Sequence, residues 1–155
     1  MKNFTSKMDK KTGLMTTSFV VFAVAVPFVM YKLGAPRVSL FMVSLIMALA
    51  FITSYMMIPQ LFLNDKTIVI KNNFVNIKIP FGNINTIEEN PKIGLNIRTM
   101  GVGGLFGHFG YFNGNDVWYV TNIHNKVKIT MKSGKIYMIS PENPEEFIKK
   151  VKNFS

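Results

Sequence analysis

The 155-residue sequence contains no cysteine, only two arginines and only two histidines. Without cysteine the chain forms no disulfide and no cysteine-based metal site. The histidines, His108 and His124, have no paired carboxylate that would complete a metal centre. No helix is rich in arginine and no basic, aromatic RNA-binding motif is present, which argues against a nucleic-acid partner. We therefore expect neither a metal nor a cofactor.

Acidic residues are also scarce, with eight against eighteen lysines and arginines, so the formal net charge is +10. Positive charge is expected beside a membrane, because basic residues flank membrane spans on the cytoplasmic side and because anionic lipids attract them. Charge is nearly missing from residues 12–64, which hold only Lys32 and Arg37. The chain therefore divides into a basic, disordered tail over 1–11, a transmembrane hairpin over 12–64 and a polar domain over 65–155.

The longest uncharged run extends from Val38 to Asn64. A bilayer core about 30 Å thick needs roughly 20 apolar residues in a helix. A buried helix of a soluble protein, which is the alternative, seldom runs that far without a charge. We predict a transmembrane helix over residues 38–58. Pro59 is expected to end or bend it, leaving residues 59–64 as an interfacial connector.

An earlier uncharged run predicts a first span over residues 13–31, with a kink near Pro27. A signal peptide is the alternative, but the run is longer than a typical signal core, and a second span follows it. The link between the spans, residues 32–37, is short and contains glycine and proline. So short a link forces the two spans to lie antiparallel.

Basic residues on either side of the hairpin predict its orientation. Four lysines precede the first span and two follow the second closely, against two basic residues in the turn. The positive-inside rule then places both termini in the cytoplasm, in a multi-pass protein of the cell membrane. The alternative is a pore or an accessory to transport, but no ionisable residue marks an ion path within the spans.

Beyond residue 65 the pattern changes to short β-type segments. Val75, Ile77 and Ile79 alternate with polar residues, as in a half-buried strand. This strand is expected to pair with residues 67–70 across a turn at 71–73. Further strands are predicted over residues 83–89, 95–98, 117–121, 126–131 and 135–139.

The end of the chain is predicted to be helical from Pro144. Asn143 and Glu146 have the spacing of a capping box, in which each side chain bonds the other's backbone. An apolar stripe follows, formed by Phe147, Ile148, Val151 and Phe154. The stripe needs a surface to bury against, and the open end of a small β-barrel is the simplest one.

Several motifs of this domain resemble those of a known family. They are Ile97-Arg98, Gly101, residues 103–107, 110–112 and 119–121, then residues 139–141 followed by Pro144 and Phe147. Together they resemble bacterial PH-like (pleckstrin-homology-like) domains, whose members often carry a transmembrane hairpin ahead of the domain. The resemblance covers about residues 60–153. It implies an α+β membrane protein with a small antiparallel β-barrel capped by a C-terminal α-helix, and it carries over no functional residues.

Motifs that would support catalysis are missing from the domain. The glycine-rich section over residues 101–110 departs from GxGxxG, because Phe106 stands where the third glycine belongs. We expect its glycines to shape the backbone, while a small enzyme using this section is the alternative. Glu88 and Glu89 are adjacent on a predicted strand, so they point to opposite faces and cannot act as an acid–base pair. The protein is therefore expected not to be an enzyme.

Basic residues are the candidate contact sites. Lys126 and Lys128 share one face of a predicted strand, and Lys132 and Lys135 extend the patch through the next turn. Arg98, the only arginine of the domain, is expected either to pair with Glu88, Glu89 or Asp116 or to line a small anion-binding contact site. The lysines form either an ordinary solvated strand face or a contact with a protein or anionic lipid headgroups, where each lysine contributes about 1 kcal/mol. The sequence thus predicts a membrane-anchored binding or scaffold module.

Overall fold

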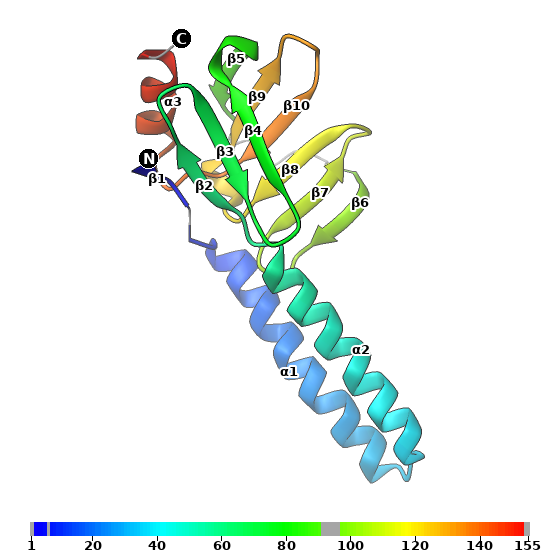
Figure 1. Ribbon diagram of the computed structural model, residues 1–155. Helices are drawn as coiled ribbons and strands as arrows, with labels where there is room; N and C mark the ends of the chain where they lie inside the picture. Colours follow the sequence, from blue (N-terminus) through cyan, green and yellow to red (C-terminus); the bar gives the residue numbers. More distant parts are fainter. Residues whose placement is uncertain (1, 6, 91–96, 154–155) are drawn as a thin grey trace.

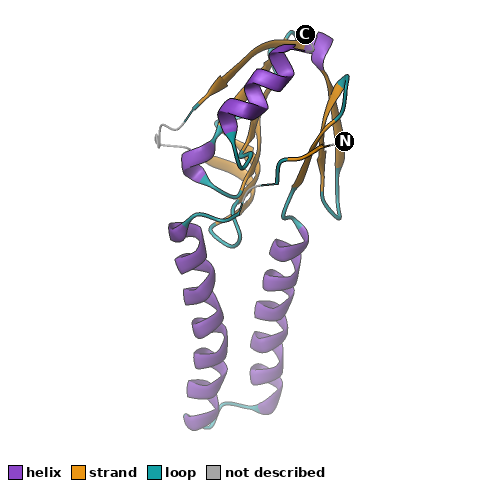
Figure 2. Ribbon diagram, turned by 90° about the vertical axis from the view of Figure 1, so that its left-hand side faces the viewer, coloured by secondary structure: helices purple, strands orange, loops and turns teal. Residues whose placement is uncertain are grey.

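The computed structural model describes residues 2–5, 7–90 and 97–153, which form a helical hairpin attached to a β-rich domain (Figure 1). The hairpin consists of α1 (Lys10–Lys32) and α2 (Arg37–Met56), which lie side by side and antiparallel (Figure 2). Both helices are long and apolar enough to cross a membrane. Only 6% of the most apolar window of each helix is buried inside the protein, unlike the core helix of a soluble protein.

The helix boundaries follow from local sequence. α1 begins after Asp9, whose side chain accepts a hydrogen bond from the backbone of Thr12, and it continues as one helix through Pro27. Gly34 has a φ of +76° in the turn, a conformation that glycine adopts without strain. α2 ends at Met56, just before Pro59. Two apolar helices in a hairpin were predicted, and the structure has them.

The first sheet has four strands in the order β1-β2-β3-β4. They are β1 (Lys2–Asn3), β2 (Gln60–Leu63), β3 (Thr67–Lys71) and β4 (Asn76–Pro80). The β3–β4 hairpin has the predicted position. Two segments differ from expectation: residues of the supposed connector form β2, and residues of the tail form β1. Both are held by burial, since Leu61 and Leu63 face the core and Phe4 follows β1 with only 3% of its surface exposed.

The second sheet has six strands in the order β5-β9-β10-β8-β7-β6. They are β5 (Ile84–Glu89), β6 (Arg98–Gly103), β7 (His108–Phe112), β8 (Asp116–Val120), β9 (Val127–Met131) and β10 (Ile136–Ile139). Two 3₁₀ turns, η1 (Phe81–Asn83) and η2 (Ile123–Asn125), precede β5 and β9. Strands were expected at the positions of β5, β8, β9 and β10. The predicted strand over residues 95–98 overlaps β6 only at Arg98, and its residues 95 and 96 lie outside the described residues. β7, within the glycine-rich section, was not predicted as a strand.

The predicted closed, antiparallel barrel is wrong. The strands form two separate sheets, and β8 and β10 pair in parallel. Between β4 and β5 the chain passes through η1 instead of a hairpin turn, so it leaves the first sheet and enters the second. After β8 it passes through η2, and the β9–β10 hairpin then folds back so that β10 lies beside β8. A crossover of this kind is what makes a parallel pair possible.

A single main core lies between the two sheets, and α3 (Pro144–Asn153) packs against it. Phe147 and Val151 are fully buried, at 0% and 1% exposed, as the apolar stripe predicted. The Phe147 ring also meets the Phe4 ring edge to face at 5.2 Å, which fastens the N-terminal segment to the helix. Phe154, the last predicted member of the stripe, lies outside the described residues.

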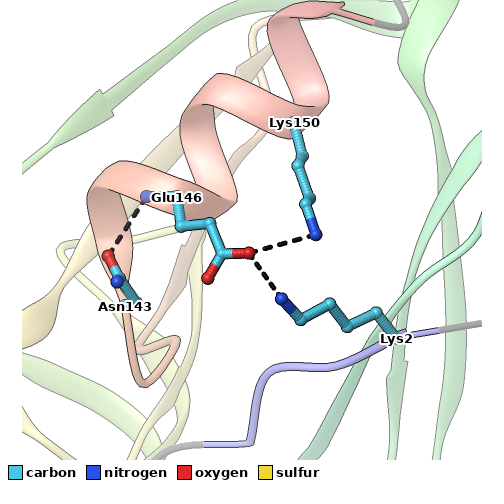
Figure 3. Close-up of polar contacts among 4 residues, drawn as sticks. All are labelled: Lys2, Asn143, Glu146 and Lys150. Carbon is cyan, nitrogen blue, oxygen red and sulfur yellow. Dashed lines mark hydrogen bonds and ion pairs between the residues drawn. The ribbon is translucent and has the colours of Figure 1, made fainter.

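The capping box forms only in part. The Asn143 Oδ1 accepts the backbone N–H of Glu146 at 3.1 Å, as predicted. The Glu146 carboxylate does not return to the backbone of Asn143; it accepts hydrogen bonds from Lys2 and from Lys150 (Figure 3). The lysine of β1 therefore takes the place of the expected backbone partner and connects the start of the chain to α3.

Candidate functional site

The five basic residues predicted as contacts do not form one patch. Lys132 and Lys135 lie at the β9–β10 turn, which is at the end of the domain away from the helical hairpin (Figure 1). Lys128 lies within β9, Lys126 directly precedes that strand, and Arg98 begins β6. The strand alternation predicted which face each side chain occupies, but not how much of that face is covered.

Lys126 is buried, with 2% of its surface exposed. Its Nζ lies 5.1 Å from the centre of the Trp118 ring, in a cation–π contact. Trp118 stacks in turn on Phe112, with 4.5 Å between ring centres. Burial lowers the pKa of the Lys126 ammonium. Lys126 thus belongs to a small second core on the outer face of the six-stranded sheet and is not available as a surface contact.

Lys128 and Arg98 are more accessible than Lys126 and lie apart from each other. Lys128 faces Glu88 across the β5–β9 pair, and the two charged groups lie 3.6 Å apart. Half-exposed ion pairs of this kind contribute about 0–1 kcal/mol. Arg98 is exposed, and its guanidinium extends toward Gly103 at the other end of β6.

An open cleft of about 550 Å³ lies between the β7–β8 and β9–β10 turns. We call it the distal cleft; it is lined by Tyr111, Asn115, Ser133, Gly134 and Lys135. Tyr111 is 43% exposed, and the Lys135 ammonium lies 5.2 Å from the centre of the Tyr137 ring. An exposed tyrosine beside a lysine can offer both apolar contact and a positive charge, a combination common in protein-binding surfaces.

The glycine-rich section forms the β6–β7 hairpin, and its glycines have structural roles. A Cβ at Gly101 would overlap the backbone carbonyl oxygen of Phe109, and one at Gly110 would overlap that of Met100. Both glycines also have positive φ, and they face each other across the strand pair. The expectation that these glycines shape the backbone therefore agrees with the geometry.

The tip of the same hairpin contacts both helices. The Phe106 ring meets the rings of Phe51 and Tyr55 in α2, with centres 5.1 and 5.6 Å apart. The Phe106 backbone N–H donates to the Thr16 Oγ1 of α1 at 3.0 Å. The β6–β7 tip thus joins the six-stranded sheet to the domain end of the hairpin, a role that the sequence alone did not reveal.

Asp9 makes a second connection between hairpin and domain. Its carboxylate accepts the backbone N–H of Thr12 at 2.8 Å, which caps α1, and the backbone N–H of Ile123 in η2 at 2.9 Å. Burial raises the pKa of Asp9, but these amide hydrogen bonds outweigh burial and hold the pKa below its usual value. An aspartate just before a long helix is a recognisable capping signal, so the cap itself was predictable from sequence, whereas the bond to Ile123 was not.

The β3–β4 turn makes a third connection. The Asn72 side-chain amide donates to the Met57 carbonyl at 3.0 Å, and the Asn73 backbone N–H donates to the Met56 carbonyl at 3.3 Å. These carbonyls stand at the end of α2, where backbone acceptors lack partners within the helix. The next residue, Phe74, has 54% of its surface exposed.

Two sheets around one core, closed by a C-terminal helix, form a domain of the PH-like class. A family model described as a bacterial PH domain matches residues 59–154, which is more than half of the chain. The chain therefore belongs to this family, and the resemblance seen in its motifs is confirmed. The match begins one residue before β2, so β2 is part of the family domain. No curated protein and no solved structure matched the chain.

Domains of the PH-like class are generally non-enzymatic modules that bind proteins or lipids. Within residues 2–5, 7–90 and 97–153, no three His, Asp or Glu side chains are grouped so as to hold a metal ion. The surfaces to consider are therefore the distal cleft and the end of the domain beside the helices.

Proposed function

We propose that this protein is a membrane-anchored binding or scaffold module, in which two helices span the cell membrane and a PH-like domain stands in the cytoplasm. The spans are residues 13–31 and 38–58, and the domain comprises residues 65–155 together with β1 and β2. The apolar side chains that both helices leave exposed support insertion, since a soluble protein seldom exposes so much contiguous apolar surface. The lysines flanking the hairpin support cytoplasmic ends.

The partner that suits this arrangement best is a cytoplasmic protein bound at the distal cleft. The observation that carries the proposal is that the cleft is lined by residues of the β9–β10 turn. This turn lies at the end of the domain away from the hairpin (Figure 1), and so away from the proposed bilayer. Tyr111 supplies an exposed aromatic surface, while Lys135 and Lys132 supply positive charge. A partner segment that carries carboxylates would complement these groups.

Two features of the glycine-rich section support a binding module over an enzyme. Its glycines are required by close backbone packing at Gly101 and Gly110. Its tip is occupied by contacts with α1 and α2. The section on which the enzyme alternative relied thus has a complete structural explanation.

Site-specific crosslinking in cells tests the proposed partner site. A photo-crosslinking residue at Asn115 in the distal cleft should give a defined protein adduct, and the same residue at exposed Lys78 on β4 should not. Lys135→Glu should remove most of the adduct at position 115, because it reverses the charge that the partner meets. Equal adducts at positions 115 and 78, or an adduct at 115 that is insensitive to Lys135→Glu, would contradict the proposal.

A further inference from the structure

The β3–β4 turn is held beside the end of a membrane-spanning helix. Asn72 and Asn73 donate hydrogen bonds to the Met57 and Met56 carbonyls, so the turn cannot move away from α2 without breaking both. In Figure 1 this turn is the part of the four-stranded sheet that lies next to α2. Phe74 at the turn therefore projects near the level at which α2 leaves the apolar core of the bilayer.

Basic side chains surround the same level. Lys71 pairs with Gln60, four residues after the end of α2, and its side chain is exposed. Lys10 and Lys11 are exposed in the first turn of α1. Because the hairpin is antiparallel, the start of α1 and the end of α2 lie at the same end of it (Figure 1).

Among the described residues, Lys10, Lys11 and Lys71 take part in no ion pair. Asp9 is the only acidic residue in residues 1–64. Its carboxylate is buried and already accepts hydrogen bonds from Thr12 and Ile123. The surface formed by Lys10, Lys11, Lys71 and Phe74, which we call the membrane-proximal surface, therefore combines an exposed aromatic ring with uncompensated positive charge.

We propose that the membrane-proximal surface binds the anionic lipid headgroups of the leaflet into which the hairpin inserts, with the Phe74 ring entering the interface. Aromatic rings favour the headgroup level, where one part of the ring meets apolar chains and another meets polar groups. Each lysine close to an anionic surface favours contact by about fivefold. The inference rests on the membrane anchoring proposed above, and it assigns lipid contact to a surface other than the distal cleft.

The test uses the full chain in nanodiscs of phosphatidylcholine and phosphatidylglycerol, with a fluorescent probe on an introduced cysteine. The chain has no native cysteine, so Asn73→Cys and, as a distal control, Ser133→Cys each carry a single label. Quenching is measured with spin-labelled phosphatidylglycerol and with spin-labelled phosphatidylcholine at equal mole fraction. At position 73 we expect strong quenching, several-fold stronger for phosphatidylglycerol, and at position 133 we expect none.

Two variants, with a third as the charge control, separate charge from apolar insertion. Replacing Lys10, Lys11 and Lys71 together by Gln should remove the preference for phosphatidylglycerol, whereas Lys132→Gln with Lys135→Gln, which also removes lysine charge, should leave it unchanged. Phe74→Ser should weaken quenching by both lipids while the preference stays.

Each contradicting outcome has a separate meaning. Failure of the chain to enter nanodiscs would overturn membrane anchoring itself. Entry without quenching at position 73 would leave anchoring intact and overturn the lipid contact. Equal quenching by the two lipids would overturn the selectivity for anionic headgroups.

Discussion

At the scale of single residues, Asp9 connects the helical hairpin to the β-rich domain. Its carboxylate caps α1 by accepting the backbone N–H of Thr12, and it also accepts the backbone N–H of Ile123 in η2. Its hydrogen bonds are to backbone amides, which is the arrangement that stabilises the charged form of a carboxylate. Removing such a cap costs about 1 kcal/mol in a typical helix, and here the connection to Ile123 is lost as well.

This arrangement predicts a pH dependence of stability. The pKa of Asp9 is lower in the folded protein than its ordinary value of 3.8. A lowered folded-state pKa means that the stabilisation is fully present above the unfolded value and is lost as the pH falls through the folded value. Thermal unfolding of the full chain in detergent should therefore show a wild-type advantage over Asp9→Ala at neutral pH that shrinks at acid pH. An advantage independent of pH would contradict the assigned role of the charge.

At the scale of elements, the β6–β7 hairpin shows what local sequence can and cannot reveal. The glycines at 101 and 110 were predicted to serve the backbone, and they do so by close cross-strand packing. That the hairpin tip would reach Phe51 and Tyr55 of α2 was not predictable, because nothing in a local pattern specifies a partner far along the chain.

A matched pair of glycine substitutions tests this element. Gly101→Ala should destabilise the domain by about 1–3 kcal/mol, since it adds a Cβ against backbone at a positive φ of 125°. Gly82→Ala is the control: its Cβ would meet nothing within 4 Å, so a change within about 0.5 kcal/mol is expected. Denaturant unfolding monitored through Trp118 measures both, and equal effects would refute the packing role of Gly101.

The same distinction between local and long-range information explains why some of the other strands and helices were predicted from sequence and others were not. The β3–β4 hairpin and α3 follow from alternation, turn residues and a cap, all of which are local signals. The division into two sheets and the parallel β8–β10 pair depend on which distant strands meet. β2 escaped prediction because its apolar residues continue the uncharged run of the preceding span. Lys126 was predicted to be a surface residue because the alternation of polar and apolar residues along a strand assigns a side chain to a face of the sheet. It does not show whether other side chains, here Trp118, cover that face.

At the scale of the whole molecule, the hairpin and the domain are joined at three places. They are the Asp9 connection to η2, the Phe106 contacts of the β6–β7 tip and the β3–β4 turn on the end of α2. The β3–β4 turn connects the four-stranded sheet to the hairpin, and the β6–β7 tip connects the six-stranded sheet to it. In the proposed arrangement, these connections would hold the distal cleft at a fixed side of the membrane and present it to the cytoplasm.

Labelling at Ser133 tests the anchoring and orientation of the protein most directly. A single cysteine is introduced at Ser133, an exposed position in the distal cleft of a chain without native cysteine. Cells are treated with a membrane-impermeant thiol reagent before and after permeabilisation, and membranes are then washed with alkaline carbonate. We expect the protein to remain in the washed membranes and to be labelled only after permeabilisation. Labelling in intact cells, or release of the protein by carbonate, would contradict the account.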